Sequence, residues 1–305
     1  MSYPIIQVKD FCKIYGDYVA VDGISFEVQR GEIFGLLGPN GAGKTSTLES
    51  LEGLRIPNGG SLRVMDVDPA RQSGKLRNLI GVQLQTSSLP ESIRLDEAMK
   101  FFCAYHGVVP RYDVLDRFGL KEKRRAQYHQ LSAGQQRRLG LALAVVHNPP
   151  VLFLDEPTSG LDVASRIELH NLMRELQNSG TTIILATHDM AEADELASRL
   201  AILLRGKIVA TGTPLALTAT GAGLTKISVY TKDSSLSDPQ LSFPAVSQRS
   251  VKEEYVIYYS KDIGPTISAI IAYLKDKEDT LFDLRVERPS LEDRFLEITN
   301  IGGAK

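Results

Sequence analysis

The chain has 305 residues, 43% of them hydrophobic, so it is long enough to bury the core of a large α/β domain and of a smaller second one. A formal net charge of -2 lacks the strong basic excess of most nucleic-acid-binding domains, so we expect no nucleic-acid partner. Cys12 and Cys103 form neither a disulfide framework nor a zinc-binding pattern, and no stretch reaches the apolar length of a membrane-spanning helix.

The first part of the chain predicts strands that lead into a glycine-rich loop. Strands are expected at residues 5–8, 23–28 and 32–37, and the second alternates apolar and polar side chains as a half-buried strand does. The third runs directly into GPNGAGKT at residues 38–45, which fits the phosphate-loop pattern GxxxxGK[ST], and a helix is expected at 45–54.

The chemistry of this loop points to a nucleotide. Its glycines let successive backbone N–H groups converge on phosphate oxygens, and the following helix presents its positive N-terminal end to them. Lys44 is expected to contact the β and γ phosphates, and the Thr45 hydroxyl to coordinate magnesium. Kinases, GTPases and many ATPases share this loop, so it predicts nucleotide binding without choosing between them.

A helical insertion is predicted within this strand-rich part, at about residues 86–146. A strand near 61–64 and a short helix at 71–79 precede it. Its first helix, at 95–105, is expected to place Leu95, Met99, Phe101 and Phe102 on one face, and a second helix is expected at 114–120.

The stretch from residue 131 to 162 carries the strongest signals. Val151 to Leu154 is a short apolar run after two prolines, typical of a strand buried on both faces of a parallel sheet. Asp155 and Glu156 follow at its carboxyl end, where open α/β sheets bind their ligands. Two carboxylates there suggest a metal and a reacting water, although an isolated Asp-Glu pair is more often a solvated strand end.

The rest of the large domain continues this pattern to about residue 214. A helix at 163–176 and a buried strand at 181–186 lead to His188, which falls at the same sheet edge as the phosphate loop. A helix at 191–198 and strands at 199–204 and 207–210 follow.

Residues 215–305 predict a small α+β domain. Strands are expected at 226–230 and 254–260, with a flexible loop over the Ser-, Asp- and Pro-rich residues 233–248 between them. An amphipathic helix is expected to use Ile267, Ile270, Ile271 and Leu274, and a half-buried strand to use Phe282, Leu284 and Val286.

Taken in order, these motifs resemble the nucleotide-binding subunit of ATP-binding cassette (ABC) transporters over roughly residues 3–214. GPNGAGKT resembles the phosphate loop, LSAGQ the family signature, VLFLDEP the second nucleotide motif, SGLD the D-loop and ATHD the His switch. The resemblance implies an α/β fold with a P-loop NTPase core, an antiparallel β subdomain and a helical insertion, followed by the small α+β domain. It also implies ATP and magnesium as cofactors.

The resemblance implies a role for each matching residue. Glu156 would polarise the attacking water, His188 would contact the γ-phosphate, and Lys44 and Gln85 would complete the catalytic set. Magnesium would be held by Thr45, by Gln85 and, through water, by Asp155. Gln83 lies close enough to Gln85 to leave the register open, and Tyr18 is an alternative to Tyr15 as the ring that stacks on adenine. The implied nucleotide contacts within one site are Tyr15, Gly38, Pro39, Asn40, Gly41, Ala42, Gly43, Lys44, Thr45 and Ser46.

The signature residues Ser132, Gly134 and Gln135, by the same resemblance, serve the ATP held by a second subunit. Asp162 would link the two sites, so hydrolysis needs a dimer, expected to be a homodimer. The sequence departs from the commoner LSGGQ at Ala133, whose methyl group is expected to tune the approach to phosphate at most.

The C-terminal residues 289–297, PSLEDRFLE, resemble the ending of exporter-type subunits for drugs, antibiotics, ions or polysaccharides. Independently, Ser290 followed three residues later by Asp293 predicts a helix N-cap.

The expected function is therefore an ATPase subunit that powers a separate membrane-spanning permease, in export, from the cytoplasmic face of the membrane. A soluble ABC-class ATPase acting on ribosomes or DNA is the alternative, although the paired cassettes or long coiled coil usual in such proteins are not seen here. A regulatory binder that does not hydrolyse ATP is disfavoured, because Lys44, Asp155, Glu156 and His188 are all present.

Overall fold

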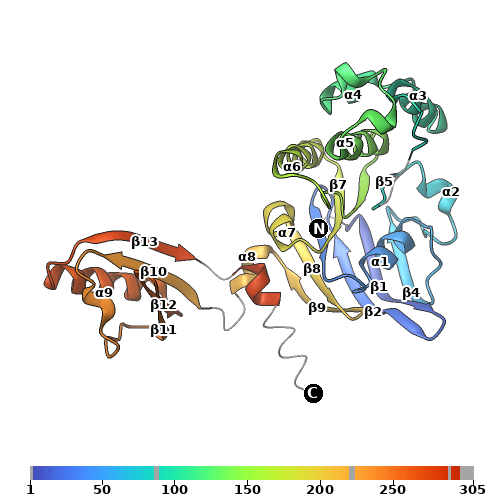
Figure 1. Cartoon of the computed structure of the whole chain (residues 1–305). Coiled ribbons are helices and arrows are strands. Elements are labelled where there is room, and N and C mark those ends of the chain that lie inside the picture. Colours follow the sequence, from blue (N-terminus) through green and yellow to red (C-terminus); the bar gives the residue numbers. More distant parts are fainter. Residues whose placement is uncertain (1–2, 86–88, 220–223, 288–289, 296–305) are drawn as a thin grey trace. The chain divides into compact units, whose positions relative to one another are not determined.

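A computed structural model describes residues 3–85, 89–219, 224–287 and 290–295. The chain divides into two compact units, Met1–Pro214 and Leu215–Lys305. Figure 1 shows the helices and strands of both units. Among the described residues, no helix has both the length and the apolar character to cross a membrane.

A six-stranded sheet forms the centre of the first unit, in the order β5-β6-β7-β3-β8-β9. Neighbouring strands are parallel except β8 and β9, which are antiparallel. The strands are β3 (Ile33–Leu37), β5 (Ile80–Gln83), β6 (Val151–Asp155), β7 (Thr182–Thr187), β8 (Arg199–Leu204) and β9 (Lys207–Gly212). Every residue of β3, β6 and β7 is buried, as the continuous apolar runs predict for strands covered on both faces.

Each face of this sheet has its own apolar core. On one face, Leu152, Leu154 and Leu185 pack with the helices α3 (Leu95–Tyr105), α4 (Tyr112–Arg117), α5 (Ala133–Ala144) and α6 (Val163–Asn178). On the other, Phe34 and Phe153 pack with the helix α1 (Lys44–Leu51) and with a second, three-stranded sheet. That sheet is antiparallel, in the order β2-β1-β4, and consists of β1 (Ile6–Tyr15), β2 (Tyr18–Val28) and β4 (Gly59–Val64).

Shorter elements complete the first unit. They are α2 (Ser73–Leu76), α7 (Met190–Leu196) and the 3-10 turns Lys121–Lys123 and Tyr128–Gln130. Figure 1 shows α3, α4 and α5 gathered on the side of β5 that lies away from β1, β2 and β4. All three helices fall within the range of about 86–146 predicted for the helical insertion.

The second unit contains a four-stranded antiparallel sheet, β11-β12-β10-β13, with a helix against one face. The helix α8 (Pro214–Ala219) begins at the last residue of the first unit. It is followed by β10 (Thr225–Thr231), the 3-10 turn Ser235–Ser237, β11 (Val246–Lys252), β12 (Tyr255–Ser260), α9 (Ile263–Asp276) and β13 (Leu281–Glu287). Ile227, Val229, Tyr258, Ile270 and Leu274 share the core of the second unit.

The N-cap prediction at Ser290 is confirmed, because its hydroxyl accepts a hydrogen bond from Asp293 N at 3.1 Å and residues 291–295 are helical. Pro289, Leu296 and Glu297 of the C-terminal motif lie outside the described residues.

Four sequence predictions are corrected by the structure. Phe101 is 64% exposed, because its side chain points away from the face that Leu95 and Met99 bury. Ile271 is likewise exposed, and Thr266 takes the buried place on that helix. The loop expected at 233–248 is shorter, because β11 begins at Val246. This strand was missed because it lies at the edge of the sheet and carries mostly polar side chains. Of the apolar residues predicted to be buried in β13, Phe282 and Val286 are exposed; a register shift between β10 and β13 turns Phe282 toward Tyr230.

Candidate nucleotide-binding and catalytic site

The phosphate loop joins β3 to α1 at the carboxyl edge of the central sheet. Gly43 has a φ of 105°, and a Cβ there would lie 2.6 Å from the Ala20 carbonyl oxygen. At Gly38 a Cβ would lie 2.4 Å from the Leu203 carbonyl oxygen. Both positions therefore require glycine, because any side chain would push the loop off the strands that hold it.

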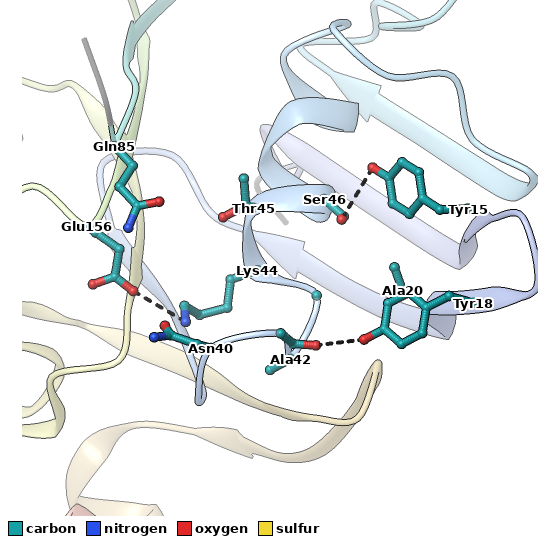
Figure 2. Close-up of a pocket in the computed structure, with 12 residues that line it drawn as sticks. Tyr15, Tyr18, Ala20, Asn40, Ala42, Lys44, Thr45, Ser46, Gln85 and Glu156 are labelled. Carbon is teal, nitrogen blue, oxygen red and sulfur yellow. Dashed lines mark hydrogen bonds and ion pairs between the residues drawn. The ribbon is translucent and has the colours of Figure 1, made fainter.

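The loop borders a cavity of about 420 Å³ (Figure 2). Figure 2 shows two tyrosines at one end of it and Gln85 and Glu156 at the other, with the loop between them. The residues that line the cavity are Tyr15, Tyr18, Ala20, Asn40, Gly41, Ala42, Gly43, Lys44, Thr45, Ser46, Gln85 and Glu156. Of these, Ala20 was not predicted. It reaches the cavity because β2 passes beside the loop, and no pattern in the sequence marks it.

Gly38 and Pro39, which were predicted to contact the nucleotide, do not line the cavity. The carbonyls of Gly38 and Pro39 accept hydrogen bonds from Lys44 Nζ, at 2.7 and 3.3 Å. These contacts hold the Lys44 ammonium inside the loop, where its side chain is almost fully buried.

Both candidate tyrosines reach the cavity. The Tyr15 hydroxyl donates to Ser46 Oγ at 3.4 Å, and the Tyr18 hydroxyl donates to the Gly41 carbonyl at 3.2 Å. Tyr15 is 38% exposed and Tyr18 58%, so each ring keeps a face on which a base could stack. The geometry leaves both rings as candidates.

Lys44 and His188 each contact the carboxylate of Glu156. Lys44 Nζ is 3.3 Å from Glu156 Oε1, and His188 Nδ1 is 2.6 Å from Glu156 Oε2. The three come from the ends of β3, β6 and β7, which are neighbours in the sheet. The parallel topology therefore brings Lys44 beside Glu156, which follows more than a hundred positions later, and His188, a further 32 positions along, as expected for the carboxyl edge of such a sheet.

Glu156 has a left-handed backbone with a φ of 48°, which is uncommon for a residue with a side chain. Its N–H donates to the Ala186 carbonyl of β7 at 2.9 Å. The backbone therefore turns out of β6 at this residue while it stays bonded to the neighbouring strand.

Asp155 and Thr45 form a second polar pair beneath the loop. Thr45 Oγ1 donates to Asp155 Oδ2 at 2.9 Å, while the other oxygen, Oδ1, is buried without a hydrogen-bond partner among the described residues. Burial raises the pKa of Asp155, the Thr45 hydrogen bond opposes this rise, and the charge of Glu156 adds to it. A hydroxyl beside a carboxylate with a free oxygen suits a hard divalent cation such as Mg²⁺.

The structure separates the two glutamines that the sequence left open. Gln85 lines the cavity, whereas Gln83 is buried and donates through Nε2 to the Arg137 carbonyl of α5 at 3.2 Å. Arg137 in turn donates to the Gln85 carbonyl at 2.8 Å. β5 ends at Gln83, so Gln85 lies beyond the strand, where the regular alternation of side chains no longer sets its direction.

The signature residues lie elsewhere in the first unit. Ser132 caps α5, with its Oγ accepting from Gln135 N at 3.3 Å, and Gln135 Oε1 accepts from Ser132 N at 3.0 Å. Within the described part of the chain, neither these residues nor Gly134 nor Asp162 line the cavity. Ala133 is exposed, so its extra methyl group displaces nothing within this chain.

Asp162 is the N-cap of α6, since its Oδ1 accepts from Ser165 N at 2.9 Å and its Oδ2 from Ser165 Oγ at 2.8 Å. Ser165 packs directly against Gly134. The structure thus brings the signature and the D-loop together, and brings the phosphate loop, Asp155, Glu156, His188 and Gln85 together as a separate group.

A glycine-rich loop between a buried strand and a helix, with a buried lysine and two carboxylates at the same edge, defines a P-loop ATPase domain. The family profile described as "ABC transporter" matches residues 21–159. Nod factor export ATP-binding protein I of Paraburkholderia xenovorans is 37% identical over 98% of this chain and 98% of its own length. The chain belongs to the ABC transporter family and is an ATP-hydrolysing, ATP-binding subunit of such a transporter.

Other relatives agree with this assignment. The probable multidrug ABC transporter ATP-binding protein YbhF of Escherichia coli is 38% identical over 72% of this chain, which corresponds to 39% of YbhF. An ATP-binding subunit of an ABC transporter is 27% identical with a TM-score of 0.64, covering 70% of this chain and 91% of that one. CbiO1 of Clostridium perfringens, part of the cbiONQ complex, is 30% identical with a TM-score of 0.63, covering 71% and 91%.

The predicted fold class and the expected ATPase activity are confirmed by these relatives, and the ribosome- or DNA-bound alternative is set aside. A regulatory binder without hydrolysis is set aside with it. Subunits of this class work as dimers with membrane-spanning partners, which agrees with the predicted partners.

Proposed function

We propose that two copies of this chain close around ATP and drive export through a membrane-spanning permease, from the cytoplasmic face of the membrane. Export is supported by Nod factor export ATP-binding protein I, which aligns with this chain over nearly its whole length, and by the exporter-like ending at residues 289–297. The observation that carries the proposal is the contact of Lys44, Glu156 and His188 at the mouth of the phosphate loop.

In this proposal each residue has one chemical task. Lys44 and the loop N–H groups neutralise the β and γ phosphates, and one of the two tyrosines stacks on adenine. Glu156 draws a proton from the water that attacks the γ-phosphorus, and the bond from that phosphorus to the bridging oxygen breaks, giving ADP and phosphate. His188 holds the Glu156 carboxylate and reaches the γ-phosphate.

Mg²⁺ would be held by Thr45, by Gln85 and, through water, by Asp155, which fits the free Oδ1 of Asp155. When bound, the ion neutralises charge on the β and γ phosphate oxygens. Ser132, Gly134 and Gln135 would contact the ATP of the second copy, which fits their position away from this chain's own cavity. The second unit, Leu215–Lys305, is proposed to be an accessory domain.

The decisive experiment replaces Glu156 by Gln in the full-length chain. The amide keeps the shape of the carboxylate but accepts no proton, so we expect ATP to bind, dimers to accumulate in size-exclusion chromatography and turnover to fall by about a hundred-fold or more. Undiminished hydrolysis would remove Glu156 from its assigned role. An exposed glutamate, Glu122, provides the matched control, since Glu122→Gln should hydrolyse ATP like the wild type.

A further inference from the structure

A pair of buried polar side chains lies directly behind the contact between Glu156 and His188. Thr158 lies two residues after Glu156, in the loop that follows β6. Glu192 lies four residues after His188, in the first turn of α7. Thr158 is 4% exposed and Glu192 2% exposed. The Thr158 hydroxyl donates to Glu192 Oε1 at 2.7 Å, a short hydrogen bond to a buried carboxylate.

The same two chain segments are therefore joined twice. The first link is the 2.6 Å contact between Glu156 Oε2 and His188 Nδ1, and the second is the hydrogen bond from Thr158 to Glu192. Asp189 fixes the start of α7, because its Oδ1 accepts from Glu192 N at 3.1 Å. Glu192 is thus held by its backbone as well as by its side chain.

Helix α6 supplies a third partner, His170, which is 2% exposed. Its Nε2 lies 3.4 Å from Glu192 Oε1, and its Nδ1 lies 3.1 Å from Glu195 Oε2. Arg174 donates to the other oxygen of Glu195 at 2.8 Å. A carboxylate removed from water needs polar partners: Glu192 Oε1 has the Thr158 hydroxyl and the nearby His170 ring, while Oε2 has no hydrogen-bond partner among the described residues.

The loop that Thr158 belongs to has a reason to be held. Glu156 keeps a φ of 48°, and such a conformation persists only where the surrounding structure fixes it. The turn after it is closed by Ser159 N to the Glu156 carbonyl at 3.3 Å and by Leu161 N to the Thr158 carbonyl at 3.1 Å. These backbone bonds shape the turn, while the Thr158 hydroxyl is its side-chain tie to α7.

We propose that Thr158 and Glu192, supported by His170, are positioning residues for ATP hydrolysis, whose hydrogen bond holds the Glu156 carboxylate in register with His188. Neither residue lines the nucleotide cavity in the described part of the chain, so both act through Glu156 and His188. This inference rests on the proposed role of Glu156.

A purely structural role predicts a different result. If the pair only fills the space between the loop, α6 and α7, its loss lowers the stability of the fold and leaves the turnover of each folded molecule unchanged. A positioning role lowers kcat and leaves KM for ATP in place, because a small displacement of a catalytic group slows the chemical step.

The test compares Thr158→Val with Thr158→Ser in the full-length chain. Valine matches the shape of threonine without the hydroxyl, whereas serine keeps the hydroxyl. We expect Thr158→Val to lower kcat about ten- to hundred-fold with KM within about two-fold of the wild type, and Thr158→Ser to stay within about three-fold in kcat. A wild-type kcat in Thr158→Val, or an equal loss in both variants, overturns the inference.

A second pair of variants covers the other end of the hydrogen bond and decides the matter if Thr158→Val does not fold. Glu192→Gln keeps an oxygen that accepts from Thr158, whereas Glu192→Met removes it at similar volume. We expect Met to lower kcat like Thr158→Val and Gln to keep most of it; equal values for Gln and Met overturn the inference. The double variant Thr158→Val/Glu192→Met should lose no more than either single variant, because both act through one bond; additive losses count against that bond.

The proposed function fails separately. If the wild type turns over no ATP, or if Glu156→Gln hydrolyses it normally, the role of Glu156 is wrong. If those two results stand as proposed and Thr158→Val is as active as the wild type, only the positioning role is wrong.

Discussion

Gly134 of α5 lies so close to Ser165 of α6 that a Cβ atom at position 134 would stand 2.4 Å from Ser165 Oγ. The same Cβ atom would lie 2.8 Å from Ser165 Cβ, so rotation of the Ser165 side chain would break its hydrogen bond to Asp162 without relieving the clash. The glycine of the signature is therefore required within a single chain, before any contact with a second copy is considered.

Gly134→Ala should consequently lower the stability of the isolated chain. The added methyl group must push α5 from α6, and overpacking of this kind costs roughly 1–3 kcal/mol. Urea unfolding of the nucleotide-free protein measures the change. Ala133→Gly is the control: it alters the neighbouring residue, whose side chain is exposed, and should lower stability by no more than about 1 kcal/mol, the usual helix penalty of glycine. Equal losses in the two variants would contradict the packing argument.

The two tyrosines of the cavity can be separated by nucleotide affinity. A base stacked on an aromatic ring contributes about 1–3 kcal/mol, so removal of the stacking ring should weaken ATP binding roughly five- to hundred-fold. We expect this loss for Tyr15→Ala and a smaller one for Tyr18→Ala, measured by calorimetry with a non-hydrolysable ATP analogue. Tyr15→Phe, which keeps the ring, should bind nearly as the wild type does. The reverse order would assign adenine to Tyr18.

Magnesium dependence should follow Thr45 and Asp155. Asp155→Asn removes the charge that faces the expected ion, and we expect hydrolysis at saturating Mg²⁺ to fall by about a hundred-fold or more. Thr45→Val should behave similarly, because it removes the hydroxyl that is 2.9 Å from Asp155, whereas Thr45→Ser should retain activity. A magnesium titration of the ATPase rate is the measurement, and full activity in Asp155→Asn would exclude this ion site.

The stability of the first unit should depend on Glu52, a buried carboxyl at the end of α1. Burial, with smaller contributions from Asp155 and Glu49, raises the pKa of Glu52 from 4.5 to about 8. In this range the folded chain keeps a proton that the unfolded chain releases, so the Glu52 contribution to stability is present below pH 4.5 and is lost as pH rises to about 8. Glu52→Gln should remove this loss and stabilise the nucleotide-free chain at pH 8, by up to a few kcal/mol.

His147, which lines the same cavity as Glu52, sets the window for that measurement. Burial, reinforced by His106, lowers the pKa of His147 from 6.5 to about 4, so its contribution to stability is present above pH 6.5 and is lost as pH falls to about 4. The two residues therefore oppose each other below pH 6.5, and only Glu52 changes above it. Thermal unfolding between pH 6.5 and 8 should show a gain that grows with pH in Glu52→Gln and is absent in Glu122→Gln.

Patterns of neighbouring residues in the sequence correctly predicted the buried strands and the glycine-rich loop. The fully buried strands β3, β6 and β7 are continuous apolar runs. The phosphate-loop pattern predicted the glycines at 38 and 43, although the carbonyls that exclude a side chain there belong to Leu203 and Ala20. Because the ends of parallel strands share one edge, the sequence also placed Asp155, Glu156 and His188 beside the phosphate loop. The 2.6 Å contact of His188 with Glu156 agrees with that placement.

Features that depend on partners distant in sequence could not be predicted. The choice between Gln83 and Gln85 depends on Arg137, and the outward turn of Phe282 depends on a register shift against β10. Likewise, nothing local distinguishes Thr158 or Glu192 from ordinary loop and helix residues. Their roles follow only from the meeting of β6, α6 and α7.

The two hydrogen bonds of Arg137 also couple α5 mechanically to the end of β5. The Arg137 carbonyl is bonded to the Gln83 side chain and its guanidinium to the Gln85 carbonyl, so α5 is fastened to the end of β5 at two points. The same helix begins at Ser132, little more than one turn earlier. A displacement of Ser132 would therefore be transmitted through the first turns of α5 to Arg137, and from Arg137 to the segment that carries Gln85.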